Sequence, residues 1–225
     1  MKKSLFALLV VFATVCSCKK NVVDTPVTNV KYMSYTSNSS WNYELHDNLT
    51  SLTARYILTA TTGDTTINAK SYHIFTHSNA GNEYYLLSGN DYYSFLNLPS
   101  TLSGALFENI YLKDNTAVNI PWSQTYNVTT SGVPLTIIIT NTIAEKSISK
   151  TVSGIAYTDV IHITSTLAVS AFGMPLPAGA VTAAIQNFYA PKVGLIQSDN
   201  KININYNGLL SNTDQQTILK SADIK

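Results

Sequence analysis

Apolar and polar residues alternate along most of the chain, in short runs that end at Gly, Asn, Asp or Ser. The runs 71–77 (SYHIFTH) and 157–169 (YTDVIHITSTLAV) both show this alternation. A period of two is typical of a strand with one buried face. Two further runs, 83–87 and 92–96, are joined by Ser-Gly-Asn-Asp and predict a β-hairpin. Regular short strands with frequent turns predict an all-β antiparallel domain with minor α content.

Other segments of the chain carry turn or helix signals. The segment Thr61-Thr62-Gly63-Asp64 predicts a turn, and residues 102–110 and 181–188 are each expected to form a helical turn or two. Residues 211–216 begin like a helix, whereas residues 217–224 alternate better as a strand. The other expected strands are 41–45, 54–60, 124–129, 135–145, 194–198 and 202–206.

A weak internal repeat relates the two halves of the chain. Trp41 and Trp122 lie 81 residues apart, and Tyr72 and Tyr157 lie 85 residues apart in similar contexts. The nearly constant offset predicts two similar β units that share one core. Each tryptophan is expected to fill the core at the start of a strand, in preference to a binding role.

The first residues have the pattern of an export signal. Lys2 and Lys3 precede an apolar run, 5–15, that is too short to span a bilayer and ends in small residues. The segment Val15-Cys16-Ser17-Cys18 resembles a bacterial lipobox, in which the final cysteine carries the lipid. Cys18 is therefore the predicted lipidation site.

Lipidation of Cys18 determines both the expected location and the cysteine chemistry. Several acyl chains on one residue anchor a protein stably, whereas a single chain binds marginally. Cys16 leaves with the signal, so the mature chain holds one blocked cysteine and forms no intrachain disulfide. The expected location is the bacterial cell envelope, at the outer membrane, on either its periplasmic face or its surface. The expected division is a signal peptide at 1–17, a lipid-anchored tether at 18–35 and a single β domain at 36–225.

Composition narrows the range of partners. Without Lys2 and Lys3, 12 basic residues face 13 acidic ones, so the mature net charge is −1. This balance gives no basic footprint for nucleic acid. Arg55 is the single arginine, which removes most bidentate anion recognition. Charged residues make up 12% of the chain, and the Thr- and Tyr-rich remainder is typical of extracytoplasmic β structure.

Three segments carry a resemblance to known proteins: Ser40-Trp41-Asn42-Tyr43, 151–161 (TVSGIAYTDVI) and 188–196 (FYAPKVGLI). With them, the chain after residue 35 resembles a group of uncharacterised lipoproteins of the Bacteroidota. The resemblance implies a strongly curved antiparallel sheet or half-closed barrel, similar in shape to periplasmic lipoprotein carriers. It also suggests an apolar concave face, but it implies no activity, because one fold serves many functions. Surface lipoproteins of this phylum often carry acidic residues after the lipidated cysteine, whereas Lys19 and Lys20 follow Cys18 here.

No local motif predicts an enzyme, a cofactor or a metal site. His73 and His77 have a zinc-binding spacing for a helix, but on a strand they lie about 13 Å apart, too far for one ion. The glutamates are scattered, so a catalytic pair of carboxylates requires assembly in three dimensions. We therefore expect a non-enzymatic protein, with a hydrolase as an alternative.

Four tyrosines of the predicted hairpin are candidate ligand-facing aromatics: Tyr84, Tyr85, Tyr92 and Tyr93. Exposed rings on a sheet can stack on sugars or line an apolar groove. Cross-strand pairing that stabilises the hairpin explains the same residues.

Thr65 is a candidate for O-glycosylation. The segment Asp64-Thr65-Thr66 resembles a short acceptor pattern of the Bacteroidota and lies in the predicted turn. An Asp-stabilised turn explains the same three residues.

Two non-enzymatic hypotheses compete. The first is an envelope lipoprotein, anchored to the membrane by its N-terminal lipid, whose curved sheet binds an apolar or amphiphilic ligand or a protein partner. The second is a carbohydrate-binding or adhesive surface module that uses exposed tyrosines. A concave face filled by its own side chains would contradict the ligand hypothesis.

Overall fold

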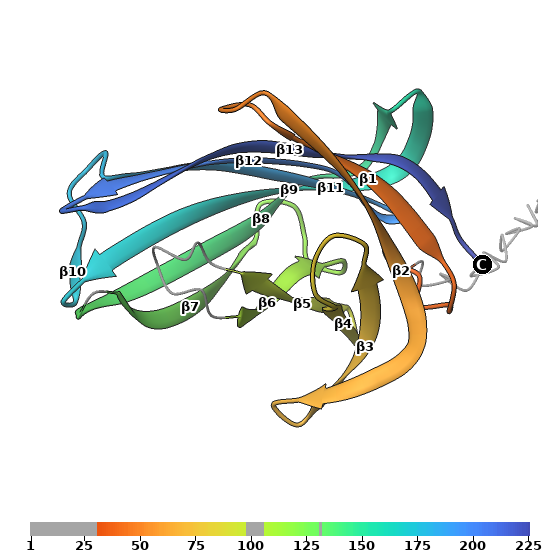
Figure 1. Ribbon diagram of the computed structural model, residues 1–225, viewed down its shortest axis with the longest axis horizontal. Coiled ribbons are helices and arrows are strands. Elements are labelled where there is room, and N and C mark those ends of the chain that lie inside the picture. The colour runs from red at the N-terminus through yellow and green to blue at the C-terminus, as the bar shows by residue number, and fades with distance from the viewer. Residues whose placement is uncertain (1–30, 98–105, 131) are drawn as a thin grey trace, which may run out of the picture.

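The computed structural model describes residues 31–97, 106–130 and 132–225. These residues form an all-β structure in which one antiparallel sheet curves until it nearly closes as a barrel (Figure 1). The strand order is β6-β5-β4-β3-β2-β1-β13-β12-β11-β9-β8-β7. The expected fold class is therefore confirmed.

The sheet consists of two up-and-down halves. The first half begins with Trp41 in β1, and the second begins with Trp122 in β7, as the internal repeat predicted. The halves are joined where the first and last strands pair, from Ser40 opposite Asp223 to Asp47 opposite Gln215. The first half contains β1 (Ser40–Asp47), β2 (Leu52–Ile67), β3 (Lys70–His77), β4 (Glu83–Ser88), β5 (Asp91–Asn97) and β6 (Leu106–Lys113). The second contains β7 (Pro121–Thr130), β8 (Val133–Val152), β9 (Ile155–Ala171), β10 (Met174–Pro175), β11 (Val181–Ala190), β12 (Gly194–Tyr206) and β13 (Leu209–Asp223).

The turn predicted at residues 61–64 does not form, and this prediction was wrong. Strand β2 continues through the segment with an irregular register between Ala60 and Asp64. The Thr61 hydroxyl accepts a hydrogen bond from the Gly63 N–H (3.0 Å) and donates one to the carbonyl of Ile74 (2.7 Å). A bulge uses the same residue types as a turn and increases the local bend of the strand.

The prediction of short helices at 102–110 and 181–188 was also wrong for the residues that the structure describes. Residues 106–110 belong to β6, and residues 181–188 belong to β11. The segment 211–216 lies in β13, so its helix-start chemistry has no effect on the fold. Strand β11 has a partner on each side, β9 and β12. Pairing on both edges outweighs the weak helix propensity of such a segment.

Buried side chains form two clusters inside the curve of the sheet. The larger cluster is rich in aromatic residues and contains Trp41, Tyr43, Phe75 and Tyr189. The smaller is mainly aliphatic and is built around Leu135, Ile137, Val169 and Ile204. Trp41 is almost fully buried, which confirms its expected role as a core residue.

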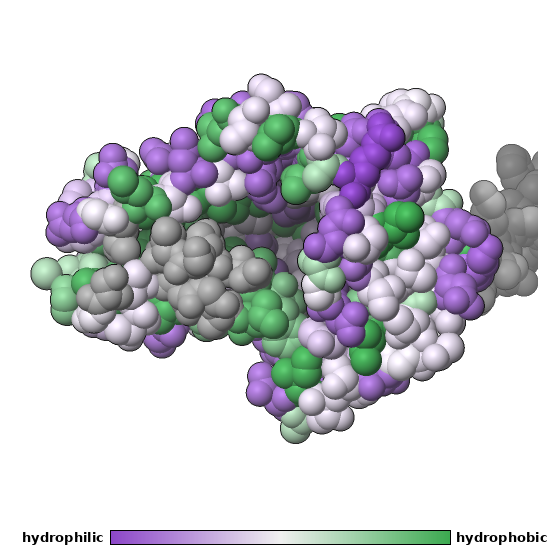
Figure 2. Space-filling view, viewed as in Figure 1, coloured by the Kyte–Doolittle hydropathy of each residue, from purple (hydrophilic) through white to green (hydrophobic). Residues whose placement is uncertain are grey.

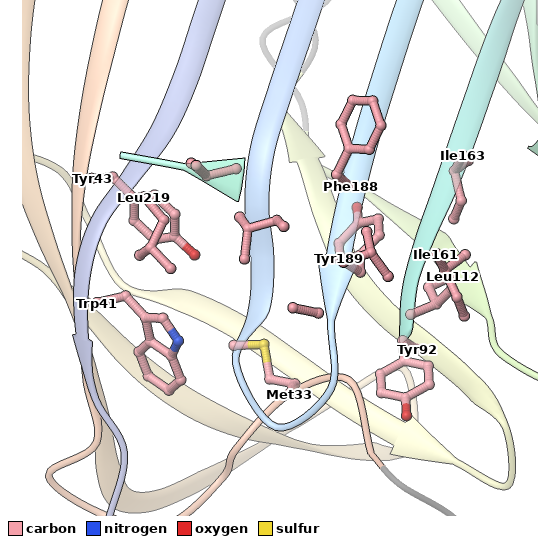
Figure 3. Close-up of a cluster of buried hydrophobic side chains, with 14 of the residues drawn as sticks. Met33, Trp41, Tyr43, Tyr92, Leu112, Ile161, Ile163, Phe188, Tyr189 and Leu219 are labelled. Carbon is pink, nitrogen blue, oxygen red and sulfur yellow. The ribbon is translucent and has the colours of Figure 1, made fainter. Parts of the chain in front are cut away.

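Residues 31–35 lie against the sheet, although the sequence assigned them to the tether. Met33 is buried in the aromatic cluster and lies between Trp41 and Tyr92 in the view of Figure 3. The Tyr32 N–H donates to the Tyr92 hydroxyl (2.9 Å), and the Tyr32 hydroxyl donates to the carbonyl of Asp159 (2.9 Å). The packed part of the chain thus includes this segment.

A seam separates the two edge strands, β6 and β7, where side chains replace a backbone ladder. The Ile110 N–H donates to Gln124 Oε1 (2.6 Å), and the Ile110 carbonyl accepts from Trp122 Nε1 (2.9 Å). The Tyr126 hydroxyl donates to the carbonyl of Glu108 (3.1 Å). These contacts satisfy edge groups of β6 that a sheet otherwise leaves open to other chains.

Candidate ligand-binding cavity

The curved sheet encloses a cavity of about 920 Å³. This volume is at the upper end of the usual range for small-molecule sites. Figure 2 shows a hollow near the centre of one face, bordered in part by hydrophobic residues. Strands from both halves of the sheet contribute to the lining. The lining residues are Met33, Tyr43, Tyr56, Leu58, Glu83, Tyr85, Ser94, Leu96, Asn109, Tyr111, Ile137, Ile139, Asn141, Ser165, Leu167, Ile185, Asn187, Tyr189, Leu195, Asn200, Ile202, Ile204, Thr213 and Gln215.

The two core clusters give the cavity two chemically different regions. The aromatic region is lined by members and neighbours of the larger cluster: Met33, Tyr43, Tyr56, Tyr85, Tyr111 and Tyr189. The aliphatic region is lined by members and neighbours of the smaller cluster: Leu96, Ile137, Ile139, Leu167, Ile202 and Ile204. The apolar part of the lining therefore changes from aromatic rings in one region to branched aliphatic chains in the other.

Rings of the aromatic region contact one another in two groups. Tyr43 stacks on Tyr56 with ring centroids 5.2 Å apart. Tyr111 makes an edge contact with Tyr85 (6.1 Å) and a tilted contact with Tyr189 (5.4 Å). Such pairs stabilise a core by about 0.5–1.5 kcal/mol beyond the burial of area. Burial raises the pKa of Tyr43, Tyr85 and Tyr111 well above the ordinary value, so these rings stay neutral.

Amide and hydroxyl groups interrupt the apolar lining in the second half of the sheet. Ser165 and Asn141 are buried, and the Ser165 hydroxyl donates to Asn141 Oδ1 (2.6 Å). Asn141 Nδ2 in turn donates to the Ile110 carbonyl across the seam (3.3 Å). Both side chains thus form hydrogen bonds within the protein. These bonds avoid the cost of leaving a buried amide unpaired, which is about 1–3 kcal/mol.

Glu83 is the charged residue among the described residues that line the cavity. Its Oε2 accepts a hydrogen bond from the Tyr85 hydroxyl (2.5 Å), and its Oε1 lies 3.9 Å from His77 Nε2. Burial, followed by the negative charge of Glu83, raises the pKa of Tyr56 and of Tyr85. The carboxylate thus lies within the aromatic region.

Of the four hairpin tyrosines, the structure places Tyr85 in the cavity lining. The hairpin itself is confirmed, with Leu87 opposite Tyr92 and a turn in which Gly89 takes a φ of 63°. Tyr92 is fully buried and donates a hydrogen bond to Asp114 Oδ2 (2.9 Å). Tyr84 makes an edge contact with Phe95, and Tyr93 lies under the ammonium of Lys70 (4.4 Å). The four rings therefore form no common exposed platform.

The histidines occupy separate places. His73 bonds to Asp64 Oδ1 (2.7 Å), His77 stacks on Tyr56 (4.3 Å), and His162 bonds to Glu145 Oε2 (2.9 Å). Among the described residues, no group of three or more His, Cys, Asp or Glu side chains is arranged to hold a metal ion.

Thr65 lies half-buried in β2 opposite Tyr72, and the turn in which a glycan was expected is absent. Its glycosylation stays a prediction. Cys18 lies outside the described residues, so its lipidation also stays a prediction.

The three sequence segments that carried the resemblance contact each other or the core. Trp41 Nε1 donates to the carbonyl of Val193 (2.6 Å), and the Tyr43 hydroxyl donates to the carbonyl of Leu195 (2.8 Å). The Ser153 hydroxyl donates to the carbonyl of Leu219 in β13 (2.9 Å). The segments therefore hold the junction between the two halves, and two of them also supply Tyr43 and Tyr189 to the cavity.

Most of the cavity lining could not be identified from the sequence. The signal for Tyr43 and Tyr189 was present in the quoted segments, and Glu83 begins the predicted hairpin. Nothing in the alternation of residues shows that these positions meet across the interior of a closed sheet.

The fold and the cavity together define a half-closed antiparallel barrel with an internal pocket. Neither a protein-family model nor a curated protein matches the sequence. A solved structure presented as that of a lipoprotein from Parabacteroides distasonis has a TM-score of 0.53 and is 12% identical, covering 86% of this chain and 99% of its own. A second, presented as an exported protein with a YmcC-like fold from Bacteroides fragilis, has a TM-score of 0.51 and is 8% identical, with the same coverage. The likeness to lipoproteins and exported proteins of the Bacteroidota is thus confirmed in the fold.

The described residues contain no helix of the length and hydrophobicity needed to cross a membrane.

Proposed function

We propose that this protein is a non-enzymatic lipoprotein of the bacterial cell envelope whose cavity binds an apolar or amphiphilic ligand. The observation that supports this proposal is the cavity of about 920 Å³, whose aliphatic region is lined by Leu and Ile residues from both halves of the sheet. The lipobox at Cys18 supports the location, as do the two structural neighbours, one presented as a lipoprotein and the other as an exported protein. The outer membrane is the proposed site of the anchor.

Binding of an apolar fluorescent probe, N-phenyl-1-naphthylamine, tests the cavity. Leu167 lines the cavity from β9, whereas its neighbour Thr166 is exposed on the opposite face of the same strand. The substitution Leu167→Trp places a large ring in the cavity, so we expect loss of probe binding. The matched variant Thr166→Trp adds the same ring outside the cavity and should bind the probe like the wild type.

Two results would contradict the proposal. One is a wild-type protein that fails to increase probe fluorescence. The other is equal binding by the Leu167→Trp and Thr166→Trp variants, with both shown by circular dichroism to be folded.

Mass spectrometry of the mature N-terminus tests the anchor. Acylated Cys18 at the N-terminus is expected. An unmodified Cys18, or a mature chain that retains Cys16, would contradict it.

A further inference from the structure

The aromatic region of the cavity contains a carboxylate, that of Glu83, which pairs with no Lys or Arg among the described residues. Glu83 lines the cavity with Tyr43, Tyr56 and Tyr85, and no Lys, Arg or His is among the described lining residues. One carboxylate oxygen, Oε2, is occupied by the Tyr85 hydroxyl. The other, Oε1, has no hydrogen-bond donor within reach among the described residues, since His77 Nε2 is 3.9 Å away.

The ring of His77 is held in place by contacts with groups other than Glu83. Its Nδ1 accepts a hydrogen bond from the backbone N–H of Asn79 (3.1 Å). Stacking on Tyr56 at 4.3 Å fixes the ring in place.

The aromatic rings that line the cavity with Glu83 provide a second attraction for positive charge. The Tyr43–Tyr56 stack and the Tyr85–Tyr111–Tyr189 series line the same region as Glu83. A ring face carries partial negative charge, and cages of such rings bind ammonium groups. The side chain of Glu83 is 38% exposed, and an anionic headgroup beside it would be repelled by a like charge.

We infer that the ligand of the cavity is a cationic amphiphile, with its ammonium group beside Glu83 among the tyrosines and its chain along the aliphatic region. This inference rests on the proposed function, because it assigns a headgroup to the ligand of the same cavity. The separation of aromatic and aliphatic lining matches the two parts of such a molecule.

Isothermal titration with three ten-carbon ligands tests the inference. Decyltrimethylammonium, decyl maltoside and decyl sulfate share one chain and differ in headgroup charge, and each is used below its micelle concentration. We expect the wild type to bind decyltrimethylammonium at least about tenfold more tightly than decyl sulfate.

A pair of charge-removing variants assigns the effect to Glu83. The substitution Glu83→Gln keeps an acceptor for the Tyr85 hydroxyl and removes the charge, so affinity for decyltrimethylammonium should fall about tenfold. The control Glu145→Gln removes the same charge from an exposed side chain outside the cavity and should leave all affinities unchanged. Unchanged binding of decyl maltoside by the Glu83→Gln variant shows that its cavity is folded.

The outcomes distinguish the assignment of a cationic ligand from the proposed ligand-binding function. Equal affinities for the three ligands, or tighter binding of decyl sulfate, overturn the assignment of a cationic ligand and leave the cavity as a binding site. Unchanged binding of decyltrimethylammonium by the Glu83→Gln variant overturns the role of Glu83. Failure of the wild type to bind any of the three overturns the proposed function itself.

Discussion

At the scale of single residues, the surroundings of Gly194 explain why a glycine occupies this position in the segment 188–196. It has a φ of 91°, and a Cβ there would lie 3.2 Å from the carbonyl oxygen of Tyr32. The residues on either side accept hydrogen bonds from Trp41 and Tyr43 through their carbonyls. A side chain at this position would therefore disturb the contact between the N-terminal segment and the turn before β12.

The substitution Gly194→Ala is expected to destabilise the protein by about 2 kcal/mol, from backbone strain and from the close approach of Tyr32. Urea unfolding measures the change. Gly154→Ala is the matched control, because Gly154 has a φ of 81° but open space around its Cβ position. It should cost about 1 kcal/mol from strain alone. Equal losses for the two variants would show that the close approach to Tyr32 has no cost.

The buried tyrosines predict an alkaline limit to stability. Burial raises the pKa of Tyr43, Tyr85 and Tyr111 in the folded state, and it raises the pKa of Tyr126 to about 12. In the unfolded chain a tyrosine ionises near pH 10. The stability that these groups contribute is therefore fully present below about pH 10 and is lost as the pH rises toward their folded pKa values.

Titration followed by tyrosinate absorbance and by circular dichroism checks this limit. We expect part of the tyrosine ionisation to occur together with the loss of β structure, because the buried rings ionise only on unfolding. Ionisation of all tyrosines near pH 10 with the sheet intact would contradict the expectation.

At the scale of strands, the seam is the place where the sheet depends on side chains. The Ile110 N–H on β6 has Gln124 Oε1 as its partner, and Gln124 Nε2 also donates to the carbonyl of Glu108 (3.3 Å). The Gln124 side chain thus makes hydrogen bonds to the backbone of β6 that the backbone of a neighbouring strand makes elsewhere in the sheet.

The substitution Gln124→Ala removes this partner, so faster hydrogen exchange is expected at the amide of Ile110. Exchange in β12 and β13, which are paired along both edges, should not change. Thr125→Ala is the control, because Thr125 is the exposed neighbour of Gln124 on β7. If the amide of Ile110 exchanges equally in both variants, the side-chain bridge does not protect the seam.

The strands also show how far the sequence determines the fold. Alternation located the strands and the 83–96 hairpin, because side chains on opposite faces meet different surroundings. It failed at Thr61–Asp64, where turn residues form a bulge, and at β11, where two neighbouring strands outweigh local preference. The cavity could not be predicted, because its lining depends on how tightly the sheet curves and where its edges meet. Gln124 and Asn141 acquire their role only when β6 comes within reach.

At the scale of the whole molecule, the two halves are expected to unfold as one unit. They share the β1–β13 ladder and the aromatic cluster, in which Leu219 of β13 is fully buried among residues of both halves. Trp41 reports on the first half and Trp122 on the second. Urea transitions of the single-tryptophan variants Trp122→Phe and Trp41→Phe should each coincide with the loss of circular dichroism.

The Trp41→Phe variant should also be less stable by about 2 kcal/mol, because it loses the hydrogen bond to Val193 and part of a fully buried ring. The lower urea midpoint of Trp41→Phe does not affect the test, because fluorescence and circular dichroism are compared within the same variant. Separate transitions for fluorescence and circular dichroism in either variant would mean that the halves unfold independently.

The pairing of β1 with β13 has a consequence for the order in which the protein folds. The strands at the centre of the sheet are the first and the last of the described residues, and Ser40 pairs with Asp223. Until the C-terminal strand is available, β1 and β12 both present open edges, which invite pairing with other chains. The sheet is therefore completed only once β13 is available, and a chain cut before residue 209, which lacks β13, should aggregate. Under the proposed export across a membrane, the sheet would stay incomplete, and the chain competent for translocation, until β13 has crossed.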